Sequence, residues 1–291
     1  MAPPKTIRFV LGATAKLFEE RGLPSARLDA EVLLAHVLGS SRIQLYTDHD
    51  RPLAEAELEP YRALVRRRLQ REPVAYLTGV REFHGITLAV DARVLVPRPE
   101  TEHLVEEALA RAGDRSDLRI ADVATGSGAV AIALGKALGA RACVWASDRS
   151  PDALEVARAN AARVGVEVTF ALGDLGAPLE PQGPFDVVTA NLPYLTAAEM
   201  DTRAPELRFE PELALAGGAD GLDLVRRLIA EAPRLLSAGG TLCLEIGAAQ
   251  GDATLALFGH GWTDAHLVHD LAGLPRVVAA TWRPDMAPAR A

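Results

Sequence analysis

Short, continuous apolar runs alternate with helix-like segments from residue 118 onward, and this alternation constrains the fold more than any other feature. Runs of this kind are typical of strands that are buried on both faces of a parallel sheet. The five runs cover residues 119–123, 142–147, 166–170, 185–190 and 241–246. Two later runs, at 265–269 and 276–281, predict a terminal antiparallel hairpin. We therefore predict a doubly wound, Rossmann-like α/β domain of about seven strands.

The part of the chain before residue 72 has a helical pattern instead. Apolar residues recur there at the spacing of one helix face, and Gly22 and Gly39 each follow such a stretch. A further helix is predicted through residues 58–69. These segments predict a small helical domain over residues 1–72, which carries no catalytic motif.

The segment between the two domains is expected to be extended. Residues 76–78 and 86–90 form two short strand-like pieces with a polar, glycine-containing turn region between them. We predict a β-hairpin linker over residues 73–96, followed by the sheet domain over residues 97–291.

Length and composition agree with a globular protein of two domains. The chain has 291 residues, of which 49% are hydrophobic. No apolar stretch approaches the roughly 20 residues that span a bilayer. The first residues lead into a polar-faced helix and not into a signal-peptide core. We therefore expect a cytoplasmic protein that does not bind membranes.

The formal net charge of −8 disfavours tight binding to nucleic acid, which requires clustered positive charge. One local exception is the basic helix face formed by Arg62, residues 66–68 and Arg71. Such a face is more often solvated than used to dock a partner, and both interpretations stay open. Cys143 and Cys243 lie in separate apolar runs, so we expect two buried thiols, without a disulfide or a metal site.

A glycine-rich segment, Asp-Val-Ala-Thr-Gly-Ser-Gly at 122–128, follows the first predicted strand and opens a helix. Glycines let the main chain approach a ligand closely, and a helix N-terminus offers free N–H groups. Asp148 ends the second strand, 20 residues past Gly128, where a carboxylate can accept both hydroxyls of a ribose. Asp174, after the third strand, can bind an adenine amino group. The candidate cofactor-binding residues are Ala124, Thr125, Gly126, Ser127, Gly128, Asp148, Asp174, Leu175 and Asn191.

This glycine pattern also fits a dinucleotide-binding fingerprint, and Asp148 and Asp174 could simply be turn or capping residues. The residues that follow the fourth strand, 191–194, favour S-adenosyl-L-methionine over a nicotinamide cofactor, because they supply acceptors for a nitrogen that is to be methylated. A dehydrogenase needs a proton donor near the hydride, and His260, His266 and His269 lie late in the chain without a suitable companion. We therefore predict S-adenosyl-L-methionine as the cofactor and no metal.

Asn-Leu-Pro-Tyr at 191–194 directly follows the fourth strand, at the sheet edge where open α/β proteins keep their chemistry. The Asn191 side-chain carbonyl and the Leu192 main-chain carbonyl can accept both N–H bonds of a planar amide or amino group. Pro193 can fix the loop, and the Tyr194 ring can cover the face of that group. We predict Asn191, Pro193 and Tyr194 as catalytic residues and residues 191–194 as the substrate-binding segment of an enzyme that modifies nitrogen.

With these motifs, the chain resembles the HemK/PrmC family almost end to end. That family methylates the side-chain amide nitrogen of the glutamine in the Gly-Gly-Gln loop of peptide chain release factors. The resemblance implies a helical substrate-recognition domain, a hairpin and a seven-stranded methyltransferase domain, with a release factor as partner. The stretches that carry it are residues 28–34, 76–79, 82–83, 94–102, 122–128, 150–154, 191–194, 211–215, 217–222 and 244–247.

Two positions depart from the family pattern. Ala124 replaces a glycine near the methionine part of the cofactor, and Leu192 replaces the first proline of Asn-Pro-Pro-Tyr. Asn-Leu-Pro-Tyr also resembles enzymes that dimethylate adenine in ribosomal RNA. Methylation of adenine in RNA and a non-catalytic scaffold that has lost the cofactor therefore remain as alternatives.

Two further features keep two interpretations each. Arg98, Glu100, Thr101 and Glu102 resemble a family signature near the catalytic cleft, but they are also suited to the start of a helix. Glu245 ends an apolar strand, where it could face the cofactor pocket or pair with a nearby cation.

Overall fold

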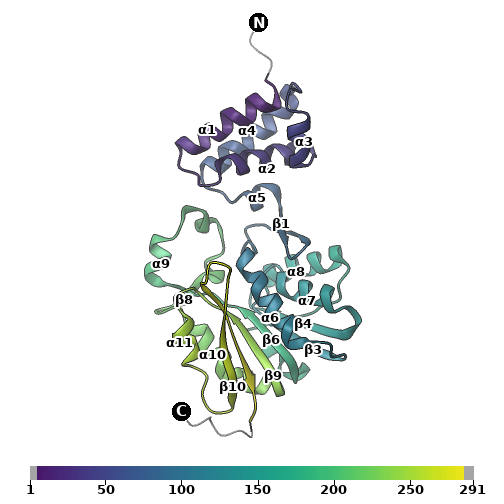
Figure 1. Cartoon of the computed structure of the whole chain (residues 1–291), viewed down its shortest axis with the longest axis vertical. Coiled ribbons are helices and arrows are strands. Elements are labelled where there is room, and N and C mark those ends of the chain that lie inside the picture. The colour runs from purple at the N-terminus through teal and green to yellow at the C-terminus, as the bar shows by residue number, and fades with distance from the viewer. Residues whose placement is uncertain (1–4, 285–291) are drawn as a thin grey trace. The chain divides into compact units, whose positions relative to one another are not determined.

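The computed structural model describes residues 5–284 and divides into two compact units (Figure 1). The first unit comprises the chain up to Val80 together with Pro205–Phe209. The second comprises Arg81–Ala204 and the chain from Glu210 onward. Among the described residues, no helix is both long enough and apolar enough to cross a membrane.

The first unit is helical around a single apolar core. Its helices are α1 (Ile7–Glu20), α2 (Ala26–Leu38), α3 (Arg42–Thr47), α4 (Glu55–Leu69) and α5 (Val74–Thr78). Thr6 caps α1 by accepting a hydrogen bond from the backbone N–H of Phe9, and Gly39 ends α2 in the left-handed conformation. Phe18 and Tyr61 are buried at the centre of this core.

The extended piece predicted at residues 76–78 is wrong, because Val74–Thr78 forms the short helix α5. Pro73 precedes its first turn and Gly79 ends it with a φ of 72°, a conformation that glycine adopts without strain. The hairpin begins after this helix, with β1 (Val80–Phe83) paired to β2 (Ile86–Ala89).

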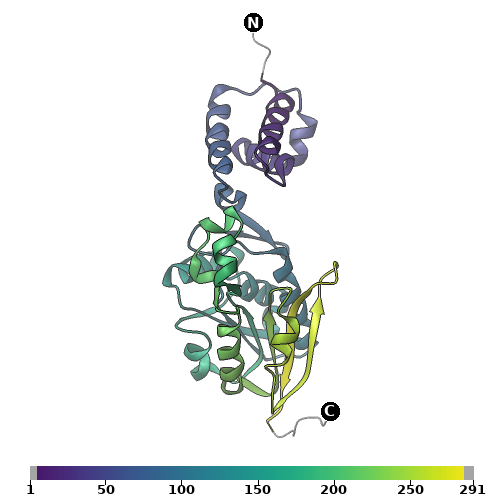
Figure 2. The same ribbon diagram turned by 90° about the vertical axis from the view of Figure 1, so that its left-hand side faces the viewer.

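A seven-stranded sheet forms the centre of the second unit, as predicted. Its strand order is β10-β11-β9-β6-β3-β4-β5. The five strands from β9 to β5 in that order run parallel, and the hairpin β10–β11 joins them antiparallel along β9, at one edge of the sheet (Figure 2). The strands are β3 (Leu118–Val123), β4 (Ala142–Asp148), β5 (Thr169–Leu172), β6 (Phe185–Asn191), β9 (Leu236–Glu245), β10 (Trp262–His269) and β11 (Pro275–Trp282).

Apolar side chains cover both faces of this sheet. Ile120 and Val187 pack with α6 (Glu102–Ala112) and α7 (Ala129–Leu138) on one face. Val123 and Ala190 pack with α10 (Asp223–Leu235) on the other face. The remaining elements are η1 (Pro99–Thr101), η2 (Gly139–Arg141), α8 (Pro151–Val164), η3 (Ala177–Gln182), β7 (Leu195–Thr196), α9 (Ala197–Thr202), η4 (Pro205–Phe209), η5 (Glu212–Ala214), β8 (Ala216–Gly218) and α11 (Gly251–Leu255).

The burial of the two thiols was predicted correctly for only one of them. Cys243 on the central strand β9 is buried, and burial raises the pKa of its thiol. Cys143 is exposed, because side chains alternate along β4 and its neighbour Val144 takes the inward position.

Candidate active site

A cavity of about 520 Å³ lies at the carboxyl ends of β3, β4 and β6. In the sheet, β3 has β4 as its neighbour on one side and β6 on the other. The strand order therefore reverses at β3, and the cavity lies at this point. Its lining includes the predicted residues 124–127, Asp148, Asp174, Leu175 and residues 191–193. Gly128 and Tyr194 are not among the described residues that line it.

The glycine-rich loop that follows β3 contains three residues in the left-handed conformation. Gly126 and Gly128 have φ values of 56° and 82°, and Ala124 has a φ of 58°. A Cβ at Gly128 would lie 2.9 Å from Cδ1 of Ile132, so this glycine permits close packing at the start of α7. A Cβ at Gly126 would meet no atom within 4 Å. The main chain at Gly126 is therefore open to a ligand.

Asp122 fixes the base of this loop, a role that the sequence pattern did not reveal. Its carboxylate accepts hydrogen bonds from the hydroxyls of Thr125 at 2.6 Å and Thr189 at 2.8 Å. It thereby connects the loop after β3 to β6. Complete burial raises the pKa of Asp122 to about 6, against the effect of these two hydrogen bonds.

Asp148 is the last residue of β4 and lines the cavity. Its Oδ2 accepts a hydrogen bond from the backbone N–H of Gly126 at 2.8 Å, and its Oδ1 accepts one from Ser150 at 2.9 Å. Each carboxylate oxygen has roughly two acceptor positions, so each keeps capacity for a ligand hydroxyl.

Asp174, predicted near the adenine, and Leu175, predicted to bind the cofactor, have different surroundings. Asp174 forms an exposed ion pair with Arg227 of α10. Leu175 has a φ of 45°, and its carbonyl accepts a hydrogen bond from the hydroxyl of Ser147 at 2.8 Å. This bond fixes the main chain of Leu175 beside the cavity.

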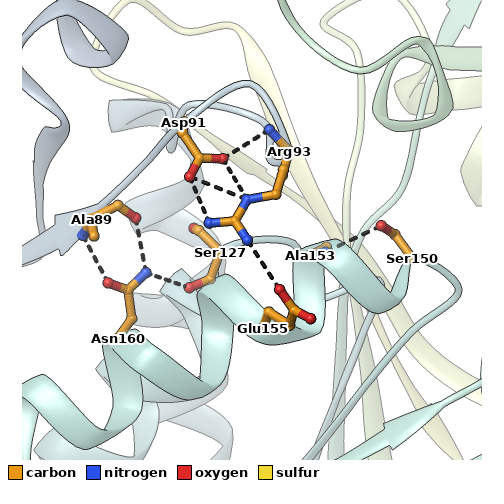
Figure 3. A network of polar contacts seen from close by, with 8 residues as sticks. All are labelled: Ala89, Asp91, Arg93, Ser127, Ser150, Ala153, Glu155 and Asn160. Carbon is orange, nitrogen blue, oxygen red and sulfur yellow. Dashed lines mark hydrogen bonds and ion pairs between the residues drawn. The ribbon is translucent and has the colours of Figure 1, made fainter.

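Asn160 of α8 is a second buried polar group that the sequence did not single out (Figure 3). Its Nδ2 donates to the carbonyls of Ser127 at 2.9 Å and Ala89 at 3.0 Å, while its Oδ1 accepts from the N–H of Ala89 at 2.7 Å. One side chain thus ties the glycine-rich loop to strand β2. The only sequence signal was a polar residue on the apolar face of a helix.

The acceptor segment, residues 191–194, begins at the last residue of β6. Asn191 Nδ2 donates to the hydroxyl oxygen of Thr101 at 3.2 Å, which directs the amide oxygen to the opposite side. The Leu192 side chain is only 2% exposed and packs in the core, so its main chain is held at the cavity wall. Burial raises the pKa of Tyr194, whose hydroxyl therefore stays neutral at physiological pH.

Two glycines, Gly217 and Gly221, form a cradle around the acceptor segment. A Cβ at Gly217 would lie 2.6 Å from the carbonyl oxygen of Pro193 and 2.7 Å from Cα of Tyr194, and a Cβ at Gly221 would overlap the Tyr194 carbonyl. Gln250 donates to that same carbonyl at 3.1 Å. These contacts leave the segment little freedom to move.

The signature segment at 98–102 borders the cavity and also lies at the start of a helix, since Pro99 begins η1 and Glu102 begins α6. Thr101 lines the cavity and contacts Asn191, whereas Glu102 accepts a hydrogen bond from the backbone N–H of His84 at 2.9 Å. Arg98 forms an ion pair with the buried carboxylate of Glu210. This ion pair connects the segment that follows the hairpin to the loop before Pro211, and Pro211 lines the cavity.

Comparison with known proteins identifies the family. Residues 10–79 match the model of the PrmC N-terminal domain, and residues 120–208 match a methyltransferase domain model. The release factor glutamine methyltransferase of Rhodopirellula baltica is 42% identical over 285 residues, which cover 95% of this chain and 96% of the relative. The chain belongs to the release factor glutamine methyltransferase family. The resemblance inferred from the motifs is therefore confirmed.

A second relative agrees with this assignment, and a solved structure shares the fold of the methyltransferase domain. The release factor glutamine methyltransferase of Geobacter sulfurreducens is 42% identical, with 94% of this chain and 95% of the relative covered. A structure of the T. thermophilus 16S rRNA N2 G1207 methyltransferase, in complex with AdoMet and guanosine, superposes with a TM-score of 0.51. It is 16% identical, and the match covers 70% of this chain and 50% of that one. This likeness supports the methyltransferase fold alone.

Proposed function

We propose that this protein transfers a methyl group from S-adenosyl-L-methionine to the side-chain amide nitrogen of the glutamine in the Gly-Gly-Gln motif of peptide chain release factors. The observation that carries the proposal is the acceptor segment, which presents two carbonyl groups at the edge of the cavity in a chain of this family. Methylation of adenine in RNA is not favoured, since the net charge is −8 and the curated relatives are named for release factors.

The cavity fits the cofactor. Its volume of about 520 Å³ is within the range of small-molecule sites, and the main chain of Gly126 is open to a ligand. Asp148 would accept the ribose hydroxyls, Asp174 and the main chain of Leu175 would hold the adenine, and residues 124–127 would contact the methionine part. The bound cofactor supplies an electrophilic methyl group on a sulfonium.

The residues of the acceptor segment position the substrate amide. An amide nitrogen is a poor nucleophile because its lone pair is delocalised into the carbonyl. Asn191 Oδ1 and the Leu192 carbonyl accept its two N–H bonds, Pro193 fixes the loop, and Tyr194 covers the amide plane. Holding the nitrogen in line and stabilising the charge that develops as resonance is lost supply most of the catalysis. The nitrogen would gain the methyl group as the bond from that group to sulfur breaks, and it would then lose one N–H proton to solvent.

The helical domain over residues 1–72 is proposed to recognise the release factor. The linker over residues 73–96, which contains α5 and the β1–β2 hairpin, is proposed to join it to the methyltransferase domain over residues 97–291. The division into compact units places Val80 in the first unit and adds Pro205–Phe209 to it. We also propose that the reaction takes place in the cytoplasm, where release factors act.

Incubation with a purified release factor and isotopically labelled S-adenosyl-L-methionine tests the function. Mass spectrometry should show one added methyl group on the Gly-Gly-Gln peptide. A release factor whose motif glutamine is replaced by alanine should not react. Methylation of RNA in place of the release factor would overturn the proposal.

A further inference from the structure

A buried carboxyl group lies beside Asn191 at the same end of the sheet. Glu245 is the last residue of β9 and the register partner of Asn191 on β6, with Val277 of β11 on its other side. It is 4% exposed, and within residues 5–284 no hydrogen-bond donor reaches its Oε2. It neither lines the cavity nor forms an ion pair in this part of the chain. A buried, incompletely paired carboxyl group is costly.

Glu245 is connected to Asn191 through Thr101. Asn191 Nδ2 donates to the Thr101 hydroxyl oxygen at 3.2 Å, so the hydroxyl hydrogen is left to donate elsewhere. Thr101 and Asn191 are close enough to the Glu245 carboxyl group that each lowers its pKa, as a hydrogen-bond donor does. The Thr101 hydroxyl hydrogen is therefore free to point toward the Glu245 carboxylate, away from the Asn191 amide nitrogen.

We propose that Glu245, acting through Thr101, is a positioning residue that holds Nδ2 of Asn191 toward the protein and Oδ1 toward the substrate. The inference rests on the proposed function. An Asn amide can rotate by half a turn about its last bond, which would exchange oxygen for an NH2 group. That group would face the N–H bonds of the substrate amide, and two sets of donors cannot bind each other. The Thr101 hydroxyl oxygen can accept a hydrogen bond only from the NH2 group of Asn191. While this oxygen serves as the acceptor, the amide is prevented from rotating.

The positioning depends on the ionisation of Glu245. Its pKa is raised to about 7, mainly by burial and further by Glu100, while Thr101, Arg276 and Asn191 oppose the rise. The pKa values of two neighbours, Tyr194 and Arg276, are both raised, so Tyr194 stays neutral and Arg276 stays charged near neutral pH. The protonated acid can donate to the Asn191 oxygen and compete with the substrate, whereas the carboxylate only accepts. Methyl transfer should therefore increase as pH rises through about 7.

Single-turnover methylation of a release factor across pH 6 to 9, at saturating cofactor, tests this dependence. We expect Glu245→Gln to lower the rate at high pH by about 10- to 100-fold and to remove the rise near pH 7, as expected for a misplaced catalytic group. The release factor concentration at half-maximal rate should change little. Thr101→Val should lower the rate similarly, and Thr101→Ser should restore most of it.

Glu231→Gln is a matched control. Glu231 on α10 also has a buried carboxylate oxygen without a hydrogen-bond partner in the described chain, but it does not line the cavity. Its substitution should leave both the rate and its pH dependence unchanged. An unchanged rate or an unchanged pH profile in Glu245→Gln would overturn the inference, and so would full activity of Thr101→Val.

A spectroscopic measurement separates this inference from the proposed function. In protein labelled with ¹⁵N asparagine, the side-chain NH2 signals of Asn191 should shift with a midpoint near pH 7. The shift should disappear in Glu245→Gln. If the wild type does not methylate release factors, the proposed function fails, yet these signals still decide the role of Glu245. Absence of a titration in the wild type would refute that role even if methylation occurs.

Discussion

Ala124 has a φ of 58°, in the left-handed region that costs an L-residue about 1–2 kcal/mol. Glycine adopts this conformation without that cost but loses more entropy on folding. We therefore expect Ala124→Gly to raise the free energy of unfolding by about 0.5–1 kcal/mol and to retain or improve affinity for S-adenosyl-L-methionine. Urea denaturation and calorimetric titration measure the two effects.

Ala131→Gly is a control that should change the free energy of unfolding in the opposite direction. Ala131 is buried within α7, where glycine lowers stability by about 1 kcal/mol. If Ala124→Gly clearly lost cofactor affinity, the pocket would have to be adapted to the alanine methyl group.

In the proposed clamp, Asn191 contributes a side-chain oxygen and Leu192 contributes a main-chain carbonyl. Asn191→Ala removes one acceptor and lets the amide rotate, so methyl transfer should fall by about 100-fold or more. Cofactor affinity should change much less. Leu192→Pro keeps the carbonyl and stiffens the loop, so activity should survive or rise. Single-turnover assays with a release factor compare the two variants. Near-normal turnover by Asn191→Ala would contradict the proposed clamp.

Residues at strand ends could be predicted from the sequence, whereas buried partners could not. Asn191 and Asp148 each end an apolar run, so their place at the sheet edge followed from the pattern. Asp122 and Asn160 depend on contacts with Thr189 and Ala89, which are 67 and 71 residues away along the chain. No local signal encodes such pairings.

At the scale of elements, α8 holds the glycine-rich loop through Asn160. Asn160→Ala would leave the carbonyl of Ser127 and the backbone of Ala89 without their partner in a buried site. We expect a loss of about 2–3 kcal/mol of unfolding free energy and weaker cofactor binding, because each unsatisfied buried polar group is costly. Thermal denaturation and calorimetry test both.

Glu155→Ala on the same helix is the control for this prediction. Its ion pair with Arg93 is exposed (Figure 3), so the expected change is within about 0.5 kcal/mol. Equal losses in the two variants would show that Asn160 has no special role in the loop.

Long or continuous patterns predicted elements well, and short ones did not. The parallel strands and the terminal hairpin followed from apolar runs, although the third strand lies later than expected, at Thr169–Leu172. Arg42–Thr47 and Val74–Thr78 were missed as helices. Six or five residues are too few to show a helical period, and α3 buries only Leu45 while Ile43 and Tyr46 are exposed, so its apolar residues do not mark one face.

For the whole molecule, two buried acids set the pH dependence of stability. The pKa values of Asp122 and Glu245 are raised to about 6 and about 7, from ordinary values of 3.8 and 4.5. The folded state thus binds these protons more tightly than the unfolded state. Stability should be greatest at low pH with respect to these groups and should fall as pH rises from about 4 to about 7, by roughly 3 kcal/mol for each.

Melting temperatures at pH 5 and pH 8 measure this dependence. We expect a lower value at pH 8 and a smaller difference in Asp122→Asn, which cannot ionise. Exposed carboxylates with lowered pKa values, such as Asp220, change stability only at more acidic pH and do not affect this interval. A melting temperature that rises between pH 5 and pH 8 would contradict the prediction.

The glycine cradle around the acceptor segment limits how this enzyme can be redesigned for other amides. Any side chain at Gly217 or Gly221 would push against the main chain of Pro193 and Tyr194, so natural drift and laboratory evolution should both reject substitutions there. New substrate preferences must come from positions that border the cavity without supporting the segment. Leu213 is such a position, since it lines the cavity and remains 45% exposed. A library that varies Leu213 and spares the two glycines would keep the methyl-accepting geometry while changing what enters it.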